Sequence, residues 1–140
     1  MIGYYAKIEK DKEENVFNVS FPDFEGGYTY GETLEEALFY ASEALSGCLA
    51  VMLNRNMEIK EQNIIDTNGL YFIKPDRNVS FVLFLKKRRD ELGLTQQQVA
   101  EMLNISYQAY QRYENVDTCN PTLKKIAKME KILNREIVTV

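Results

Sequence analysis

Hydrophobic and polar residues alternate along the first thirty residues, the pattern of strands that bury one face. The alternation predicts strands over Tyr4–Glu9 and Val16–Phe21, joined into a hairpin by the polar turn Asp11–Asn15. A turn containing Gly26–Gly27 follows, and Tyr28–Tyr30 has the character of a third short strand. The N-terminal segment therefore predicts a small three-stranded sheet.

The hydrophobic period changes from two to three or four residues after Thr33. Thr33 is a favourable helix N-cap, and Glu36 stands where it can complete a capping box. The residues that recur at helical steps are Leu34, Ala37, Leu38, Ala41, Leu45, Cys48 and Met52. This pattern predicts one long helix that packs its apolar face against the sheet.

A second pair of helix signals lies between Leu94 and Glu114. Thr95 and Gln98 have capping-box spacing, and the predicted helix places Val99, Met102 and Leu103 on one inward face. Asn104 and Ile105 leave room only for a tight turn, and Ser106 can cap a further helix that ends near Glu114. Two short helices joined so tightly are typical of a unit that reads DNA.

The second helix of this pair has outward residues suited to nucleic acid. Helical spacing places Ala109, Tyr110 and Tyr113 inward. Gln can pair with adenine, Arg with guanine, and Ser with phosphate, while a helix opening such as that at Gln96 favours a phosphate. Any single Gln here fits an ordinary polar surface helix, but the arrangement as a whole favours DNA binding. The candidate DNA-binding residues are Gln96, Gln97, Ser106, Tyr107, Gln108, Gln111 and Arg112.

The stretch from Phe84 to Asn134 resembles the repressor-type helix-turn-helix domain of the Cro and phage-repressor kind, the XRE family. About fifty residues match in register, although the segment Val116–Asn120 replaces the usual Gly-rich turn. The residues that carry the resemblance are Leu92-Gly93-Leu94-Thr95-Gln96, Val99-Ala100, Leu103-Asn104-Ile105-Ser106, Arg112-Tyr113-Glu114-Asn115 and Pro121-Thr122-Leu123-Lys124-Lys125-Ile126-Ala127.

Charge divides the 140-residue chain into unequal halves. Residues 1–66 hold 5 Lys and Arg against 13 Asp and Glu, a formal charge of −8, whereas residues 67–140 hold 12 against 8, giving +4. The division favours an acidic half and a nucleic-acid-binding half, although many soluble proteins are mildly acidic. Cys48 and Cys119 have no metal-ligand spacing and are expected to be reduced thiols of a cytoplasmic protein. No signal peptide is expected, and the apolar stretch Cys48–Leu53 is short for a membrane span.

The sequence contains no His, which excludes His-based triads and His-ligated zinc sites. No phosphate-binding glycine motif is present. Carboxylate chemistry remains, but the predicted first strand offers only Lys7 and Glu9 where a two-metal nuclease needs several converging acids. We therefore expect neither catalysis nor a metal or other cofactor.

The segment Ser20-Phe21-Pro22-Asp23-Phe24-Glu25-Gly26-Gly27-Tyr28-Thr29-Tyr30-Gly31-Glu32-Thr33-Leu34-Glu35-Glu36-Ala37 resembles the HicB antitoxin family. The resemblance implies an α+β chain: a partial RNase H-like β-β-β-α-β domain, followed by an all-α repressor-type helix-turn-helix domain. It also makes Leu70–Ile73 the candidate final strand. The expected domain boundaries are 1–74 and 75–140.

The two resemblances together imply an antitoxin that masks a HicA-type toxin, a small basic mRNA-cleaving ribonuclease, and represses its own operon. Aromatic residues beside acids near a turn are suited to an interface, so the candidate toxin-binding residues are Asp23, Glu25, Tyr28, Tyr30 and Glu32. Two alternatives stay open: a transcriptional regulator whose N-terminal domain senses a ligand or another protein, and an orphan HicB-like protein without a toxin gene nearby.

Oligomerisation is expected from the geometry of operator binding. One recognition helix covers one half-site, so an inverted-repeat operator calls for a homodimer or a higher homo-oligomer. The apolar end Ile137–Val140 could add a strand across such a dimer or be a disordered terminus. No membrane partner is expected.

Overall fold

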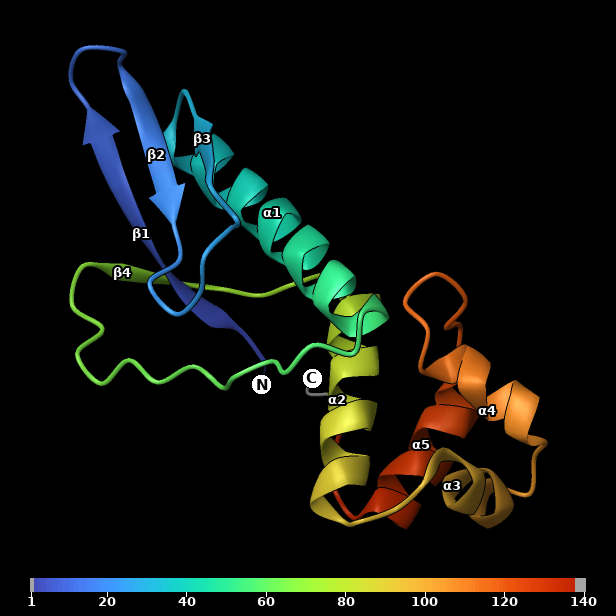
Figure 1. Ribbon diagram of the computed structural model, residues 1–140. Coiled ribbons are helices and arrows are strands. Elements are labelled where there is room, and N and C mark those ends of the chain that lie inside the picture. Colours follow the sequence, from blue (N-terminus) through green and yellow to red (C-terminus); the bar gives the residue numbers. More distant parts are fainter. Residues whose placement is uncertain (1, 138–140) are drawn as a thin grey trace. The chain divides into compact units, whose positions relative to one another are not determined.

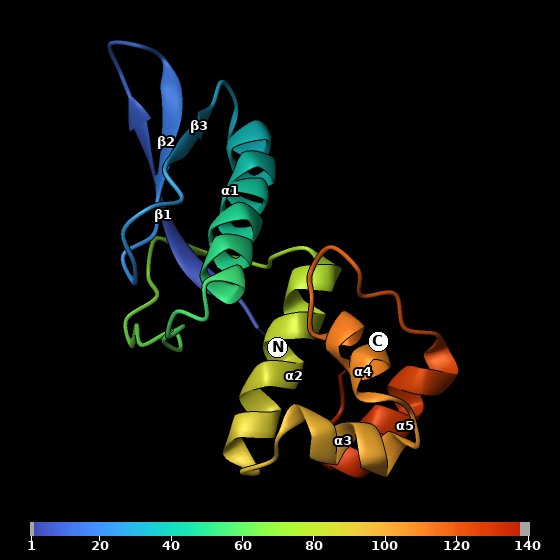
Figure 2. The ribbon, with the colours of Figure 1, turned by 45° about the vertical axis from the view of Figure 1, so that its right-hand side comes forward.

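The computed structural model describes residues 2–137, and the chain divides into two units, one ending at Asp76 and the other beginning at Arg77. The N-terminal unit is a four-stranded antiparallel sheet with the helix α1 against one face (Figures 1 and 2). The predicted Ile137–Val140 segment falls almost wholly outside the described residues. The strands are β1 (Tyr4–Asp11), β2 (Val16–Ser20), β3 (Thr29–Gly31) and β4 (Leu70–Ile73), in the order β3-β2-β1-β4.

Strand register explains which residues form the core of this sheet. Ile8 pairs with Val19, and Tyr4 pairs with Ile73, so alternation directs these side chains to the same face. Tyr4, Val19 and Ile73 are all at least 96% buried, as are Ala6 and Phe21. The predicted hairpin and the final strand are confirmed, and β4 closes the far edge by pairing with β1 rather than with the third strand.

Helix α1 (Leu34–Asn54) begins at the predicted N-cap. The Thr33 hydroxyl accepts a hydrogen bond from the Glu36 amide at 3.1 Å, which is the Thr33 half of the predicted capping box. Ala37, Ala41 and Leu45 are fully buried, which confirms the helical period. A Cβ added to Gly31 would lie 2.4 Å from the Ala37 backbone nitrogen, so β3 can reach the first turn of α1 only with glycine there.

Helix α1 is also long and apolar enough to cross a membrane, with 21 residues and a mean hydropathy of 1.3. It is longer than the apolar stretch Cys48–Leu53 noted in the sequence, because alanines earlier in the helix continue its apolar face. Core helices of soluble proteins meet the same length test, and the buried residues of α1 pack on the sheet. The length of α1 is therefore weak evidence for a membrane span.

The C-terminal unit consists of α2 (Arg77–Glu91), α3 (Gln96–Leu103), α4 (Tyr107–Tyr113) and α5 (Leu123–Leu133) (Figure 1). Its core lies among all four helices, and the side chains buried to at least 98% are Val79, Val82, Leu83, Leu85, Val99, Ala100, Leu103, Tyr110, Met129 and Leu133.

One predicted core position in α3 is wrong. Met102 is 46% exposed, whereas Ala100 is 99% buried. The buried face of α3 runs through Val99, Ala100 and Leu103, and a residue one position before Leu103 lies about 100° away around the helix. The small Ala100 side chain allows close packing that the sequence period did not assign.

Candidate functional site

Helices α3 and α4 form the predicted two-helix unit, joined by a three-residue turn. The α3 capping box is complete: the Gln98 amide donates to the Thr95 hydroxyl at 3.1 Å, and the Thr95 amide donates to Gln98 Oε1 at 2.8 Å. Asn104 takes the left-handed conformation (φ 57°) that ends α3, and Ser106 caps α4 by accepting from the Ala109 amide. Turn and caps together fix the direction in which α4 leaves α3.

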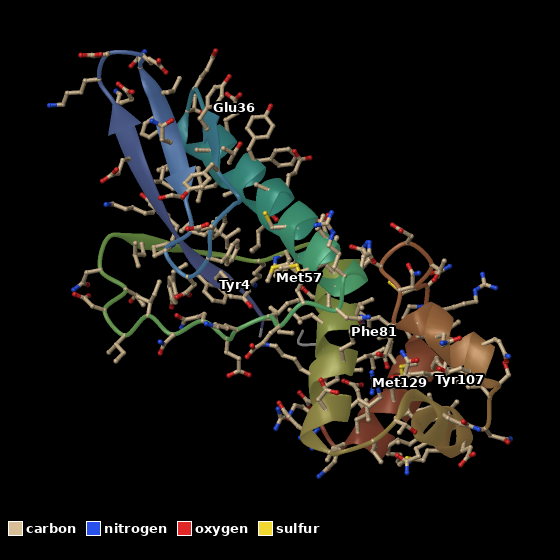
Figure 3. All side chains as sticks on the ribbon, viewed as in Figure 1. Tyr4, Glu36, Met57, Phe81, Tyr107 and Met129 are labelled. Carbon is tan, nitrogen blue, oxygen red and sulfur yellow. The ribbon has the colours of Figure 1, made fainter. Side chains whose placement is uncertain are left out.

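Most of the predicted DNA-binding residues lie at the surface of this unit. Tyr110 is fully buried, so the opposite side of α4 is exposed. Tyr107 is 40% exposed and is labelled in Figure 3. The other exposed candidates are Gln97, Ser106, Gln108, Gln111 and Arg112. The exposed surface of α3, α4 and the turn between them can offer amide, hydroxyl and guanidinium groups to a ligand.

Gln96 differs from the other candidates because its side chain is engaged within the protein. Its amide nitrogen donates to Glu114 Oε1 at 3.2 Å, and its amide oxygen accepts from the Tyr107 hydroxyl at 3.4 Å. The residue is half-buried. This position orients Gln96 and Tyr107 with respect to each other and leaves less of Gln96 for a phosphate than the sequence suggested.

A buried ion pair supports that arrangement and was not anticipated from the sequence. Arg89, on α2, donates from Nε and Nη2 to the two carboxylate oxygens of Glu114 at 2.8 and 2.9 Å, and from Nη1 to the Leu94 carbonyl at 3.1 Å. The Glu114 side chain is fully buried and that of Arg89 is 16% exposed. Hydrogen bonding to Glu114 raises the pKa of Arg89. The bidentate pair ties the end of α4 to α2.

Tyr110 brings a hydroxyl into the same buried region. Among the described residues, this hydroxyl has no hydrogen-bond partner. Burial, and then the nearby Glu114 carboxylate, raise the pKa of Tyr110, so the phenol stays neutral. An unpaired buried hydroxyl lowers stability, and the fit of the ring into the core offsets that cost.

The segment after α4 is an ordered turn in place of a glycine-rich one. The Asn115 carboxamide and carbonyl oxygens accept from the amides of Asp117, Thr118 and Cys119, and the Thr118 hydroxyl donates to the Arg112 carbonyl at 2.8 Å. Burial raises the pKa of the Cys119 thiol, which disfavours its reactive thiolate form. Both Cys119 and Cys48 are free thiols, as expected.

In the N-terminal unit, the predicted toxin-binding residues are spread over the turn before β3, β3 itself and the residue that follows it. Tyr28 and Tyr30 are 72% and 60% exposed, and Glu25 and Glu32 are exposed as well. Asp23 differs, because its Oδ2 atom is buried in a cleft of about 220 Å³. The five residues therefore differ in how far solvent reaches them.

The carboxylates considered for catalysis do not assemble into a metal site in the described structure. Glu9 forms a surface ion pair with Lys7 at 3.0 Å, and both side chains are more than half exposed. Across residues 2–137, no group of three or more Cys, Asp or Glu side chains is placed to hold a metal ion.

Comparison with known proteins agrees with both units. Residues 4–84 match the family model described as the HicB-like antitoxin of bacterial toxin–antitoxin systems, and residues 85–140 match a helix-turn-helix model. No curated protein matches the chain. The fold and these matches define a two-domain α+β protein with a DNA-binding helix-turn-helix domain. Since the first match covers more than half of the 140 residues, the chain belongs to the HicB-like antitoxin family.

Two crystal structures resemble part of the chain. The N-terminal domain of the Burkholderia pseudomallei antitoxin HicB has 17% identity and a TM-score of 0.45, covering 54% of this chain and 99% of that one. The Burkholderia pseudomallei antitoxin HicB has 18% identity and a TM-score of 0.47, covering 56% and 67%. The family assignment rests on the sequence match to residues 4–84.

Proposed function

We propose that this protein is an antitoxin that neutralises a HicA-type mRNA-cleaving toxin through residues 1–74 and represses its own operon through residues 75–140. The observation that carries the proposal is the joining of a HicB-like antitoxin domain to a helix-turn-helix domain in one chain. The proposed protein acts in the cytoplasm, without a cofactor and without catalysis of its own.

The charge of the N-terminal unit supports toxin binding. Residues 2–76 contain 6 Lys and Arg against 14 Asp and Glu, a formal charge of −8. A domain of this charge attracts a basic ribonuclease and competes with RNA for its surface. Exposed Tyr28 and Tyr30, beside Glu25 and Glu32, supply aromatic and acidic contacts of the kind that interfaces use.

The C-terminal unit has the charge and the exposed residues for operator binding. Residues 77–140 carry a formal charge of +4. We propose that α4 enters the major groove with Gln108, Gln111 and Arg112 nearest the bases, while Ser106 and the α3 opening face phosphates. A homodimer would then place two such helices on an inverted repeat.

Toxin binding is tested with residues 1–76 and with the full chain, each co-expressed with the product of the adjacent gene. We expect both proteins to co-purify with the toxin and to restore the growth of cells that express it, because the antitoxin domain forms its own unit. If only the full chain retains the toxin, the division of functions is wrong. If neither does, a regulator with a different partner, or an orphan HicB-like protein, becomes the better explanation.

Operator binding is tested by titrating wild type, Arg112→Ala and Arg135→Ala against operator and scrambled duplexes at two salt concentrations. If Arg112 pairs with a guanine, Arg112→Ala should lose about 1–3 kcal/mol of binding free energy on the operator. It should also relax the base preference at that one base pair. Arg135→Ala removes the same charge just after α5, and it should weaken binding to both duplexes slightly and by the same factor. Equal binding of both duplexes by wild type would contradict the proposed role of α4.

The absence of catalysis is tested on purified protein incubated with RNA and with DNA in the presence of Mg²⁺ or Mn²⁺. We expect both substrates to stay intact, since the chain lacks His and the Lys7–Glu9 pair is a surface contact. Metal-dependent cleavage that a single carboxylate substitution abolishes would show that the protein is an enzyme.

A further inference from the structure

A cleft of about 220 Å³ opens between the turn after β2 and the segment that follows α1. Its walls include the apolar side chains of Phe24 and Met52, and Tyr4, on β1, also lines it. Tyr4 is labelled in Figure 3. Its charged lining comes from Asp23, Glu58 and Lys60. Pockets for drug-sized ligands measure about 300–1,000 Å³, so this cleft suits a group of side-chain size.

The Asp23 carboxylate gives the cleft a buried acceptor oxygen. Its Oδ2 atom is buried and has no hydrogen-bond partner among the residues that the structure describes. Lys60 does not neutralise it: within the same range, the Lys60 ammonium forms no ion pair with Asp23, and the residue contributes its carbonyl oxygen to Tyr4 instead. Buried polar atoms in proteins are normally hydrogen-bonded, so this oxygen is open to a donor from a ligand.

The surroundings of Asp23 are held in place without a ligand. The Phe24 ring stacks on Phe21 with centroids 5.3 Å apart and meets the Tyr4 ring edge-on at 5.5 Å. The Tyr4 hydroxyl donates to the Lys60 carbonyl at 2.7 Å, joining β1 to the segment after α1. Gly27, with φ +72°, lies so close to Phe21 that a Cβ there would approach its ring to 2.8 Å. The cleft is therefore preorganised, which reduces the ordering cost of binding.

We propose that this cleft binds the cationic end of a lysine or arginine side chain from the protein partner of the N-terminal domain. The aliphatic stem would lie along Phe24 and Met52, while the ammonium or guanidinium group donates to Asp23 Oδ2. Glu58, at the rim, and Glu61, whose charge acts on Tyr4, add negative potential. The occupant named here rests on the proposed toxin-binding function, since a basic toxin supplies such side chains.

The chemistry of the cleft is tested on the full chain by NMR titration with n-butylammonium and with the neutral n-butanol. In wild type, n-butylammonium should shift the amides of Phe24 and Lys60 saturably, and n-butanol should not. Asp23→Asn keeps the shape and removes the charge, so it should lose these shifts, whereas Glu43→Gln, an exposed site on α1, should keep them. No saturable shift in wild type, or equal shifts in Asp23→Asn, would overturn the proposal.

The occupant is tested by measuring toxin affinity for the same three proteins. We expect Asp23→Asn to weaken toxin binding about 30-fold or more, and Glu43→Gln less than threefold. The thermal midpoint of Asp23→Asn should stay equal or rise, because the buried Oδ2 atom of Asp23 has no hydrogen bond to lose. Toxin bound equally by wild type and Asp23→Asn would overturn this inference and leave the proposed function standing. A wild-type chain that binds no toxin would overturn both the function and the occupant.

Discussion

Replacing Glu114 by Ala should destabilise the C-terminal unit more than any change at its surface. The Glu114 side chain is fully buried and accepts three hydrogen bonds, two from Arg89 at 2.8 and 2.9 Å and one from Gln96 at 3.2 Å. Removing the carboxylate leaves the Arg89 guanidinium, only 16% exposed, without its buried counter-ion, and the exposed Asp90 carboxylate is 3.9 Å away. Breaking a buried pair in this way costs about 3–5 kcal/mol.

That cost is comparable to the whole stability of a small domain, about 5–15 kcal/mol. The assay is urea unfolding of the full chain followed residue by residue through NMR cross-peaks, so that the two units report separately. Glu101→Ala, an exposed carboxylate on α3, is the matched control and should change the unfolding free energy by less than about 0.5 kcal/mol.

A double replacement, Arg89→Met with Glu114→Leu, separates the value of the pair from the penalty of an unpaired charge. It should recover most of the loss, because neither charge then remains buried. DNA binding by the double variant should still be weakened, since Gln96 loses the acceptor that orients it. If Glu114→Ala unfolds at the same urea concentration as Glu101→Ala, the ion pair has no structural role and this reasoning is wrong.

Two tyrosines should respond oppositely to replacement by Phe. Tyr110→Phe should raise the unfolding free energy by about 1 kcal/mol, because the hydroxyl that it removes is buried and unpaired. Tyr4→Phe should lower the unfolding free energy by about 1 kcal/mol, because it loses the hydrogen bond to the Lys60 carbonyl. Both effects are read from urea midpoints, and the same sign for both would contradict the hydrogen-bond assignment. In alkali, Tyr4 has a pKa raised from 10.0 to about 12 in the folded state, so the folded protein keeps its proton where the unfolded chain loses it. Stability should therefore fall as the pH rises from about 10 to about 12, and Tyr4→Phe should show a shallower fall in the same range. Gly31→Ala would place a Cβ 2.4 Å from the Ala37 backbone nitrogen, so we expect β3 to detach from α1. The amides of β3 should then exchange faster with solvent. Unchanged exchange would argue against the close packing of β3 on α1.

The local elements of both domains could be predicted from the sequence because their signals are local. Thr95 with Gln98, and Ser106 with Ala109, form their caps through residues three apart in the chain, and the structure shows each bond. The strands β1 and β2 followed from alternation, with boundaries that differ by one or two residues. Family resemblance, rather than periodicity, supplied β4.

Other features depend on residues that are distant in the chain. Gln96 is expected at a phosphate because a helix opens there, and no signal in the sequence indicates that its amide also donates to Glu114, 18 residues later. Arg89 and Glu114, 25 residues apart, carry no local signal that they form a buried pair. Met102 was misplaced because the period of a short helix leaves its buried face uncertain by about one residue.

The sequence alone determined the α+β class, the capped helix pair, and the division into an acidic and a basic half, because these depend on composition and on spacings within one turn or strand. Tertiary structure decided which polar groups are used internally and which remain open. Asp23 and Glu25 look alike in the chain, but packing around Phe24 buries an oxygen of the first in a cleft and leaves the second in solvent. Only three-dimensional packing can make that distinction, since burial depends on which distant segments cover a residue.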